Sequence, residues 1–309
     1  MKKMKTKNLV SGFDLSPQEI KDIFKLTKML KKKKTLTVLK NKIIGLVFQK
    51  PSMRTRVSFE VGIKQLGGES IYLAPNDIKL GQREPIKDIG RVLSRYLDGI
   101  VVRTFSHDHV IELAEYAGIS VINGLSDLYH PAQALADIYT ILEKRGKLKG
   151  VTLSFIGDGN NVVHSLLAIG TQVGLNITIA TPRGYEPNKQ IWEKACLLAK
   201  RNKSKLIHTY DPKAAVKDAD FIYTDVWASM GQEKEHKKRV KDFQNYQINN
   251  ALLKYSGKTG KYQIMHCMPV HRGEEITDKI AESKQSIIID QAENRLHVQK
   301  AIMALLIKK

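Results

Sequence analysis

Cysteine is scarce in this sequence, because its 309 residues include only Cys196 and Cys267. Two cysteines cannot build the disulfide framework of a small secreted domain, nor do they supply the ligands of a structural zinc site at the usual spacing. We therefore expect reduced cysteines, a cytoplasmic protein and no bound metal.

Long apolar runs are also lacking. No segment approaches the roughly 20 apolar residues that a membrane-spanning helix needs. The basic segment 1–10 is not followed by the apolar stretch of a secretory signal, because a helical pattern begins near Pro17. These features predict a protein without a membrane anchor.

Acidic residues are few, with 31 against 51 lysines and arginines, which gives a net charge of +20. The lysines are spread along the chain, with a compact run at 31–34 and a weaker one at 234–241. Neither run is accompanied by interleaved aromatic residues or a zinc-finger spacing, as nucleic-acid-binding modules would require. We interpret most of the charge as a solvated, lysine-rich surface that attracts anions, and keep nucleic-acid binding as a remote alternative.

Short apolar segments alternate with helical patterns along the whole chain. Strands are predicted at 43–48, 70–73, 100–102, 121–122, 151–156, 177–180, 206–207, 221–223, 263–265 and 287–289, mostly separated by helices. This alternation is typical of an α/β fold with parallel sheets covered by helices on both faces. The polar, glycine-containing segment 145–150 divides the pattern, so we predict doubly wound domains at 1–147 and 148–294, with the last helix, 295–309, returning to the first domain.

The first strand–helix junction carries an unusual concentration of polar groups. Ser52 is placed to cap the helix that follows the apolar strand, and Thr55 lies in its first turn. Arg54 and Arg56 occupy the same turn, where the positive end of the helix dipole disfavours cations. The negative charge of a bound phosphate would compensate the positive charges of these two arginines. The alternative is that both arginines point into solvent.

Two later strands of the first half end at further polar residues. Arg103 follows the strand at 100–102, and His130 and Gln133 follow the strand at 121–122. A loop salt bridge for Arg103 and a structural hydrogen bond for His130 are the alternatives. Carboxyl ends of parallel strands meet at one edge of a sheet, so these groups should converge there. Together with Ser52 to Arg56 they suit a small phosphate that carries a carbonyl.

In the second half, residues 157–161 (Gly-Asp-Gly-Asn-Asn) resemble a dinucleotide-binding turn. Val162 stands where the third glycine belongs, and no acidic residue ends the next strand, so a nicotinamide cofactor is not expected. Asp225 offers a carboxylate for an amine, while Asn161, Ser229 and Met230 offer neutral donors and acceptors for an amino-acid head group. The alternative for Asp225 is a helix or loop cap.

Cys267 lies at the end of the strand at 263–265, beside His266. A zinc site is not expected because four ligands at the usual spacing are absent, and no orienting partner marks a protease nucleophile. The alternative is that Cys267 is a small, buried side chain that only fills space in the apolar core.

Four segments together resemble the aspartate/ornithine carbamoyltransferase family, and within it the ornithine carbamoyltransferases. They are 48–60, with Ser-x-Arg-Thr-Arg, 130–133, with His-Pro-x-Gln, and the segments 225–231 and 266–275. They occur in the family's order over nearly the whole chain, which also includes Ala292 to Arg295. Met53 and Lys79 depart from the family's usual residues.

The resemblance implies roles for individual residues. Carbamoyl phosphate would be bound by Ser52, Met53, Arg54, Thr55, Lys79, Arg103, His130, Gln133, Cys267, Met268 and Arg295. L-Ornithine would be bound by Asn161, Asp225, Ser229 and Met230, and the catalytic residues would be Cys267, Arg54, Arg103, His130 and Asp225. The products would be L-citrulline and phosphate, without a cofactor, in arginine biosynthesis or in the reverse, catabolic direction.

The resemblance also implies a homotrimer or a multiple of trimers, in which a loop from a neighbouring subunit reaches the phosphate. Lys79 matches the loop residue that is usually glutamine or histidine, and Gln82 is a weaker candidate for this contact. Putrescine, acetylornithine or aspartate as the acceptor remain alternatives. So does a nonenzymatic relative that has kept only the phosphate site.

Overall fold

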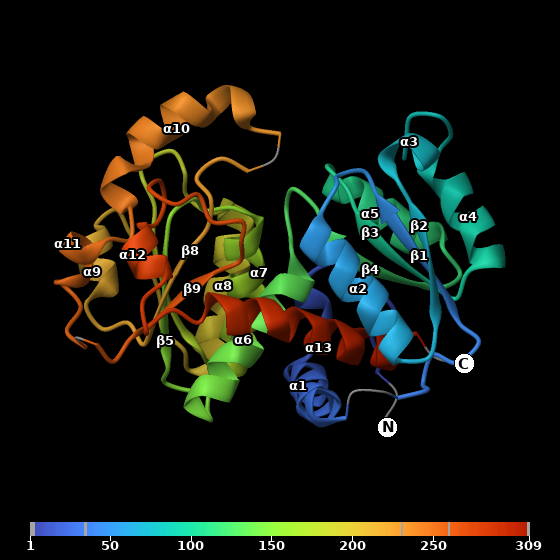
Figure 1. The fold of residues 1–309 in the computed structure, drawn as a ribbon, viewed down its shortest axis with the longest axis horizontal. Coiled ribbons are helices and arrows are strands. Elements are labelled where there is room, and N and C mark those ends of the chain that lie inside the picture. The colour runs from blue at the N-terminus through green and yellow to red at the C-terminus, as the bar shows by residue number, and fades with distance from the viewer. Residues whose placement is uncertain (1–3, 34–35, 230, 259, 308–309) are drawn as a thin grey trace. The chain divides into compact units, whose positions relative to one another are not determined.

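The computed structural model describes residues 4–33, 36–229, 231–258 and 260–307 (Figure 1). Contacts within the chain divide it into unit 1, Met1–Tyr139 with Asn294–Lys309, and unit 2, Thr140–Glu293. The divisions fall inside the helices α6 (Pro131–Arg145) and α13 (Ile288–Leu306), whereas the predicted boundaries were 147/148 and 294/295.

Unit 1 contains a four-stranded parallel sheet in the order β2-β1-β3-β4. The strands are β1 (Ile43–Phe48), β2 (Glu69–Leu73), β3 (Gly99–Arg103) and β4 (Ser120–Leu125). β1 and β3 are buried almost throughout, as expected for continuous apolar runs in a sheet that is covered on both faces. The four strands predicted for this half are confirmed.

The helices of unit 1 follow the predicted alternation. They are α1 (Pro17–Lys32), α2 (Met53–Gln65), α3 (Pro75–Ile78), α4 (Ile86–Tyr96) and α5 (His107–Tyr116), preceded by the short η1 (Gly12–Asp14). α1 begins with a capping box between Ser16 and Glu19. α3 is a four-residue helix between β2 and α4.

Unit 2 contains a five-stranded parallel sheet in the order β7-β6-β5-β8-β9. Its strands are β5 (Thr152–Ile156), β6 (Asn176–Ala180), β7 (Leu206–Thr209), β8 (Phe221–Thr224) and β9 (Gln263–His266). Its helices are α7 (Asn161–Gly170), η2 (Thr171–Val173), α8 (Lys189–Asn202), α9 (Pro212–Val216), η3 (Glu233–Glu235), α10 (His236–Phe243), η4 (Gln244–Tyr246), α11 (Asn250–Leu253) and α12 (Asp278–Ala281).

The strand predicted at Ile287–Ile289 is wrong, because α13 begins at Ile288. Ile264 forms only an isolated bridge with Ser286, one residue earlier. Three consecutive isoleucines fit a short buried strand as well as the first turn of a helix, and periodicity cannot separate the two over such a length. No helix in the described ranges is long and apolar enough to cross a bilayer.

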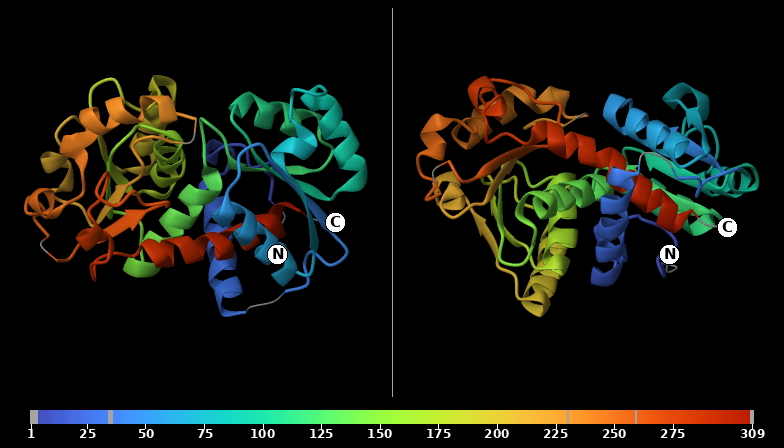
Figure 2. Two further views of the ribbon diagram at one scale, coloured as in Figure 1. Left: turned by 45° about the horizontal axis from the view of Figure 1, so that its top comes forward. Right: turned by 60° about the horizontal axis from the view of Figure 1, so that its bottom comes forward.

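The predicted return of the last helix to the first domain is confirmed. From Asn294 onward α13 packs beside α1 and α2 (Figures 1 and 2). Lys300 Nζ donates a hydrogen bond of 2.8 Å to Gln65 Oε1, and Lys31 Nζ donates one of 2.9 Å to Asn294 Oδ1. Gly62 of α2 permits this close packing, since a Cβ atom there would lie 3.2 Å from the Lys300 side chain.

Candidate active site

In unit 1 the strand order reverses between β1 and β3, which is where ligands bind in doubly wound sheets. Phe48 at the end of β1 pairs with Arg103 at the end of β3. Shortly after β1, Ser52 Oγ accepts a hydrogen bond of 3.3 Å from the backbone N–H of Thr55, and so caps α2 as predicted. The N-terminus of α2 and Arg103 therefore stand at one topological switch point.

Three arginines gather near this helix N-terminus. Arg103 is only 7% exposed, and its burial, together with repulsion from Arg295 and Arg54, lowers its pKa to about 10. Within the described residues, neither Arg54 nor Arg103 pairs with a carboxylate, and Arg103 Nε has no hydrogen-bond partner. Buried like charges are costly unless an opposite charge compensates them, so the cluster suits an anion.

Arg56 behaves differently from Arg54, although both lie in the first turn of α2. Its Nε donates a hydrogen bond of 2.9 Å to Glu60, and its guanidinium lies 3.7 Å from the centre of the Tyr72 ring. The alternative that the arginine side chain lies at the surface and binds no ligand therefore applies to Arg56. Met53, the first residue of α2, is 69% exposed.

His130 and Gln133 lie at the start of α6, after β4. Burial of His130, reinforced by repulsion from Arg295 and Arg103, lowers its pKa well below the ordinary value, so the imidazole is neutral at pH 7. The amide of Gln133 is oriented by a hydrogen bond of 2.8 Å from Nε2 to Asp137 Oδ1. The other end of that amide, Oε1, is buried and has no hydrogen-bond partner among the described residues, which leaves an acceptor for a ligand N–H.

Unit 2 has its own switch point, between β5 and β8. Asp225 follows β8 and is buried, and its carboxylate accepts three hydrogen bonds. The donors are Cys267 Sγ at 2.9 Å, Asn160 Nδ2 at 2.9 Å and the backbone N–H of Val226 at 2.8 Å. Asp225 and Cys267, which are 42 residues apart in the chain, therefore form a direct thiol–carboxylate pair.

Asn160 belongs to the candidate site through its contact with Asp225, and it was not predicted because only its neighbour Asn161 was singled out. Asn160 Oδ1 accepts hydrogen bonds from the first turn of α7, and its Nδ2 is thereby directed at Asp225. Asn161 is the first residue of α7 and is half-buried. Gly159 serves close backbone packing, since a Cβ atom there would lie 2.4 Å from the nitrogen of Pro187.

His266 fixes the loop that carries Cys267. Its Nδ1 accepts a hydrogen bond of 2.8 Å from the backbone N–H of Met268, so the ring proton is on Nε2, which lies 3.0 Å from Glu275 Oε1. Ligand atoms of Asp225, His266 and Cys267 lie within 4.8 Å of one another. Both nitrogens of His266 are nevertheless committed, so we assign it the role of holding the loop.

Arg239 of α10 is a second residue missed from the sequence. Its Nη1 donates to the backbone carbonyl of Trp227 at 3.0 Å and to Asp158 Oδ2 at 2.9 Å. Burial raises the pKa of Asp158 to about 6, although Arg239 opposes this shift. Most of the basic charge was interpreted as solvated surface, and Arg239 in the run 234–241 is an exception, because this buried side chain ties α10 to the segment that follows Asp225.

Three further predicted residues lie in loops or at the end of a helix. Ser229 is half-buried, and its backbone N–H donates to Gln232 Oε1 at 2.9 Å. Met268 has a positive φ of 60°. Lys79 is exposed and ends α3 in the left-handed conformation, whereas Met230 lies outside the described residues.

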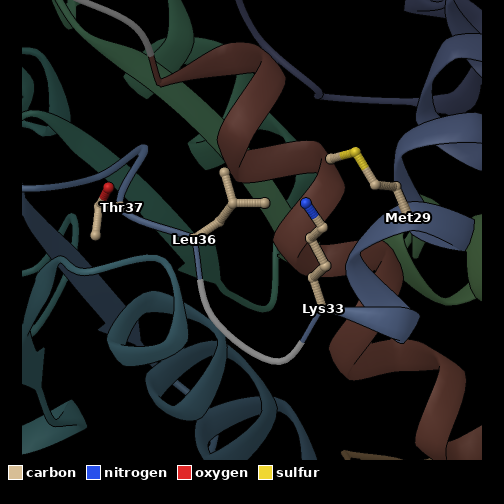
Figure 3. Close-up of a pocket in the computed structure, with 4 residues that line it drawn as sticks. All are labelled: Met29, Lys33, Leu36 and Thr37. Carbon is tan, nitrogen blue, oxygen red and sulfur yellow. The ribbon is translucent and has the colours of Figure 1, made fainter.

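A pocket of about 410 Å³ lies elsewhere in unit 1. It is lined by Met29, Lys33, Leu36 and Thr37, and Figure 3 shows the Lys33 side chain between those of Met29 and Leu36. None of the predicted site residues lines it, so we assign it no role in the reaction.

These features define a class: a two-unit α/β protein with a cationic cluster at the switch point of one sheet and a carboxylate–thiol pair at that of the other. Residues 7–143 match the family model of the carbamoyl-P binding domain of the aspartate/ornithine carbamoyltransferases, and residues 149–306 match that of their Asp/Orn binding domain. The chain belongs to the aspartate/ornithine carbamoyltransferase family.

Similar proteins span the same length. The chain is 50% identical to an ornithine carbamoyltransferase from Bacillus cereus, over 99% of this chain and 96% of that protein. It is 51% identical to an ornithine carbamoyltransferase from Thermococcus kodakarensis, over 94% of this chain and 93% of that protein. Among solved structures, the ornithine carbamoyltransferase from Pyrococcus furiosus superposes with a TM-score of 0.95 at 47% identity, covering 99% of both chains.

Proposed function

We propose that this protein is an ornithine carbamoyltransferase, which transfers the carbamoyl group of carbamoyl phosphate to the side-chain amine of L-ornithine. Full-length identity of about half to proteins of that name supports this function. The structural observation that carries it is the buried Asp225 carboxylate, held by Cys267 and Asn160 at a switch point, where a cationic amine would find its counter-charge.

The carbamoyl phosphate site is proposed to be the cationic cluster of unit 1. The phosphate would bind the first turn of α2, with Ser52, Met53, Arg54 and Thr55, and the guanidinium of Arg103. The oxygen of the carbamoyl group would accept hydrogen bonds from His130 and the arginines. The amino group of the same carbamoyl group would donate a hydrogen bond to Gln133 Oε1. Arg295, Cys267 and Met268 would complete the surroundings of the carbamoyl end.

Ornithine is proposed to bind unit 2 through Asn161, Asp225, Ser229 and Met230. Its side-chain ammonium, with an ordinary pKa of ~10.4, must lose a proton before it can attack. The Asp225–Cys267 pair would accept this proton, and the free amine would form a bond to the carbamoyl carbon. The carbon–oxygen bond to phosphate then breaks, the electron pair leaves with phosphate, and a second proton from the attacking nitrogen passes to the phosphate.

Charge stabilisation would lower the barrier to this transfer. Negative charge develops on the carbamoyl oxygen and on the leaving phosphate, and Arg54 and Arg103 lie where they can meet it. The low pKa of His130 keeps its imidazole neutral, so it would act as a hydrogen-bond donor to the oxygen and would not add a further cation.

Product analysis tests the proposal. Purified protein is supplied with carbamoyl phosphate and, in turn, L-ornithine, putrescine, acetylornithine or aspartate, and the carbamoylated product is quantified. We expect citrulline with a kcat/KM at least about a hundredfold above that for each other amine, because an unused charged group in a site is costly. A preference for another amine, or no product at all, would refute it.

A homotrimer, or a multiple of trimers, and a cytoplasmic location are part of the same proposal. Unit 1 exposes apolar side chains at helical spacing on α2, at Val57 and Val61, and another at Ile71 of the edge strand β2. Exposed apolar side chains on neighbouring elements are typical of a protein interface. Lys79 is exposed as well, and in the trimer it would reach the phosphate site of a neighbouring subunit.

Mixed oligomers test the contribution of Lys79. Arg54→Ala should inactivate the subunit that carries it, whereas Lys79→Ala should inactivate the site of a neighbour. Mixing the two variants after dissociation should therefore recover part of the activity. Light scattering that shows a monomer, or mixtures that recover nothing although each variant oligomerises, would contradict the shared site.

A further inference from the structure

A second group of ionisable side chains lies in unit 2 between α10 and the turn 271–275. Ligand atoms of His271, Glu274 and Glu275 all lie within 4.8 Å of one another. Glu274 Oε2 lies 3.7 Å from His271 Nδ1 and also 3.1 Å from Nε2 of His236, a fourth residue that stands outside this group of three and whose ring would turn toward a shared ion. Two imidazoles from different elements thus face one carboxylate oxygen.

Glu275 adds a separate observation. Its side chain is fully buried, and Oε1 accepts hydrogen bonds from His266 Nε2 at 3.0 Å and from the backbone N–H of His271 at 2.6 Å. The other oxygen, Oε2, is buried and has no hydrogen-bond partner among the described residues. A buried carboxylate oxygen without a donor is unfavourable, and a cation beside it would compensate the loss of water.

We propose that His236, His271, Glu274 and Glu275 form a binding site for a divalent transition-metal ion such as Zn²⁺. Two imidazole nitrogens with carboxylate oxygens are a donor set that suits this ion. With metal–ligand bonds of ~2.0–2.2 Å, tetrahedral geometry places ligand atoms about 3.3 Å apart. The separations of 3.1 and 3.7 Å around Glu274 Oε2 lie on either side of this value.

A metal ion can reach this site from solvent, and two of its side chains can change their orientation. The side chains of His236 and His271 are 42% and 41% exposed, so an ion can enter from solvent and the rings can rotate toward it. Glu275, by contrast, is held in place by His266. The ion would connect the first residue of α10 to the turn 271–275, and so restrain a helix that otherwise reaches the Trp227 segment through Arg239.

The site is distinct from the thiol–carboxylate pair. His266 separates them, since one of its nitrogens faces Glu275 while the other accepts from Met268. To exclude binding at the pair, the experiment uses the full-length Cys267→Ala variant as the parent. Metal binding and backbone exchange, not turnover, are then the readouts, so the outcome does not depend on the proposed activity.

Isothermal titration of this parent with Zn²⁺, and absorption spectra with Co²⁺, should show one tight site. His236→Ala and His271→Ala should each weaken Zn²⁺ binding by roughly 10- to 100-fold or more, because even residues that only orient a ligand contribute about that much. His208→Ala removes a half-buried histidine that contacts Thr181, and should bind as the parent does. Hydrogen exchange of α10 amides should slow when Zn²⁺ is added to the parent and to His208→Ala only.

Two results would overturn the proposal. One is a parent that binds no Zn²⁺ in the micromolar range, which would leave His236 and Glu274 as an ordinary ion pair. The other is Zn²⁺ binding that is unchanged by both His236→Ala and His271→Ala. Both histidines are partly exposed, so we expect the variants to fold, and circular dichroism of each variant checks this.

Discussion

Arg295 Nη2 donates a hydrogen bond of 2.8 Å to Thr55 Oγ1, although the two residues are 240 positions apart in the chain. Thr55 lies in the first turn of α2, and Arg295 lies in α13. Ser52 Oγ donates to the same threonine oxygen at 3.0 Å. The last helix therefore takes part in organising the helix N-terminus at which the phosphate is proposed to bind.

Thr55→Val tests this relationship, because it removes the acceptor of Arg295 with little change in shape. A hydrogen bond to a charged group contributes about 1.5–3 kcal/mol, so we expect KM for carbamoyl phosphate to rise roughly 10- to 100-fold. Steady-state kinetics at saturating ornithine measure the change. Thr55→Ser keeps the hydroxyl and should stay within a few-fold of the parent, and an equal loss in both variants would contradict this role for the hydroxyl.

Arg54 and Arg56 offer a matched comparison on one helix turn. Arg54→Met should abolish the increase in Tm that phosphate or carbamoyl phosphate produces, because it removes a cation that no described carboxylate neutralises. In the parent, ligand at 100 times its Kd stabilises the folded state by about 2.7 kcal/mol.

Arg56→Met should keep the ligand response, since Arg56 is occupied by Glu60 and Tyr72. Thermal unfolding with and without phosphate measures both variants. A normal phosphate response in Arg54→Met, or its loss in Arg56→Met alone, would reverse our assignment of the two arginines.

Local sequence signals predicted where several polar residues of unit 1 lie. Ser52 was recognisable as a helix cap after an apolar strand, and Arg103 and His130 as polar residues at strand ends. Parallel topology alone brings such ends to one edge of the sheet. The sequence did not separate Arg54 from Arg56, because the acidic and aromatic partners of Arg56 are recognisable only when α2 and β2 are packed together.

The contacts of the candidate site in unit 2 were harder to predict because they depend on tertiary packing. Cys267, Asn160 and Asp225 come from three separate strand ends, and no local pattern indicates that the thiol faces the carboxylate. Arg239 resembles its lysine neighbours in the sequence and differs only in what it reaches, namely Asp158 and the carbonyl of Trp227. The triplet Ile287–Ile289 was too short for its periodicity to distinguish strand from helix.

Asp225→Asn should affect the amine substrate selectively. Removing one partner of a buried charged hydrogen-bonded pair costs about 2–5 kcal/mol, so kcat/KM for ornithine should fall by at least roughly 30-fold. The affinity for phosphate, measured by titration, should remain within a few-fold of the parent, because the cationic cluster is untouched. Asp211→Asn, which alters only the cap of α9, is the control and should retain activity. A similar loss in both variants, or a loss of phosphate affinity in Asp225→Asn, would contradict the assignment.

The capping box of α1 predicts a specific dependence of stability on pH. Burial by itself would raise the pKa of Glu19, but hydrogen bonds from Ser16 and Thr6 outweigh burial and lower the pKa to about 2. The carboxylate accepts from the backbone N–H groups of Ser16, Thr6 and Lys5. Because the folded state holds the ionised form, this contribution is complete above the ordinary glutamate pKa of 4.5 and is lost as pH falls toward 2.

Glu19→Gln should therefore reduce the free energy of unfolding by about 1–3 kcal/mol at pH 7. The difference between parent and variant should be as large at pH 6 and should shrink steadily between pH 4.5 and the lowest pH at which the parent stays folded. Urea unfolding of both proteins at several pH values measures it. Asp22→Asn on the same helix, where the carboxylate accepts from the Gln18 side chain at the surface, should change the stability by less than about 0.5 kcal/mol. A difference for Glu19→Gln that stayed constant from pH 7 to pH 3 would show that the loss of shape or cap geometry, and not of the charge, accounts for the destabilisation.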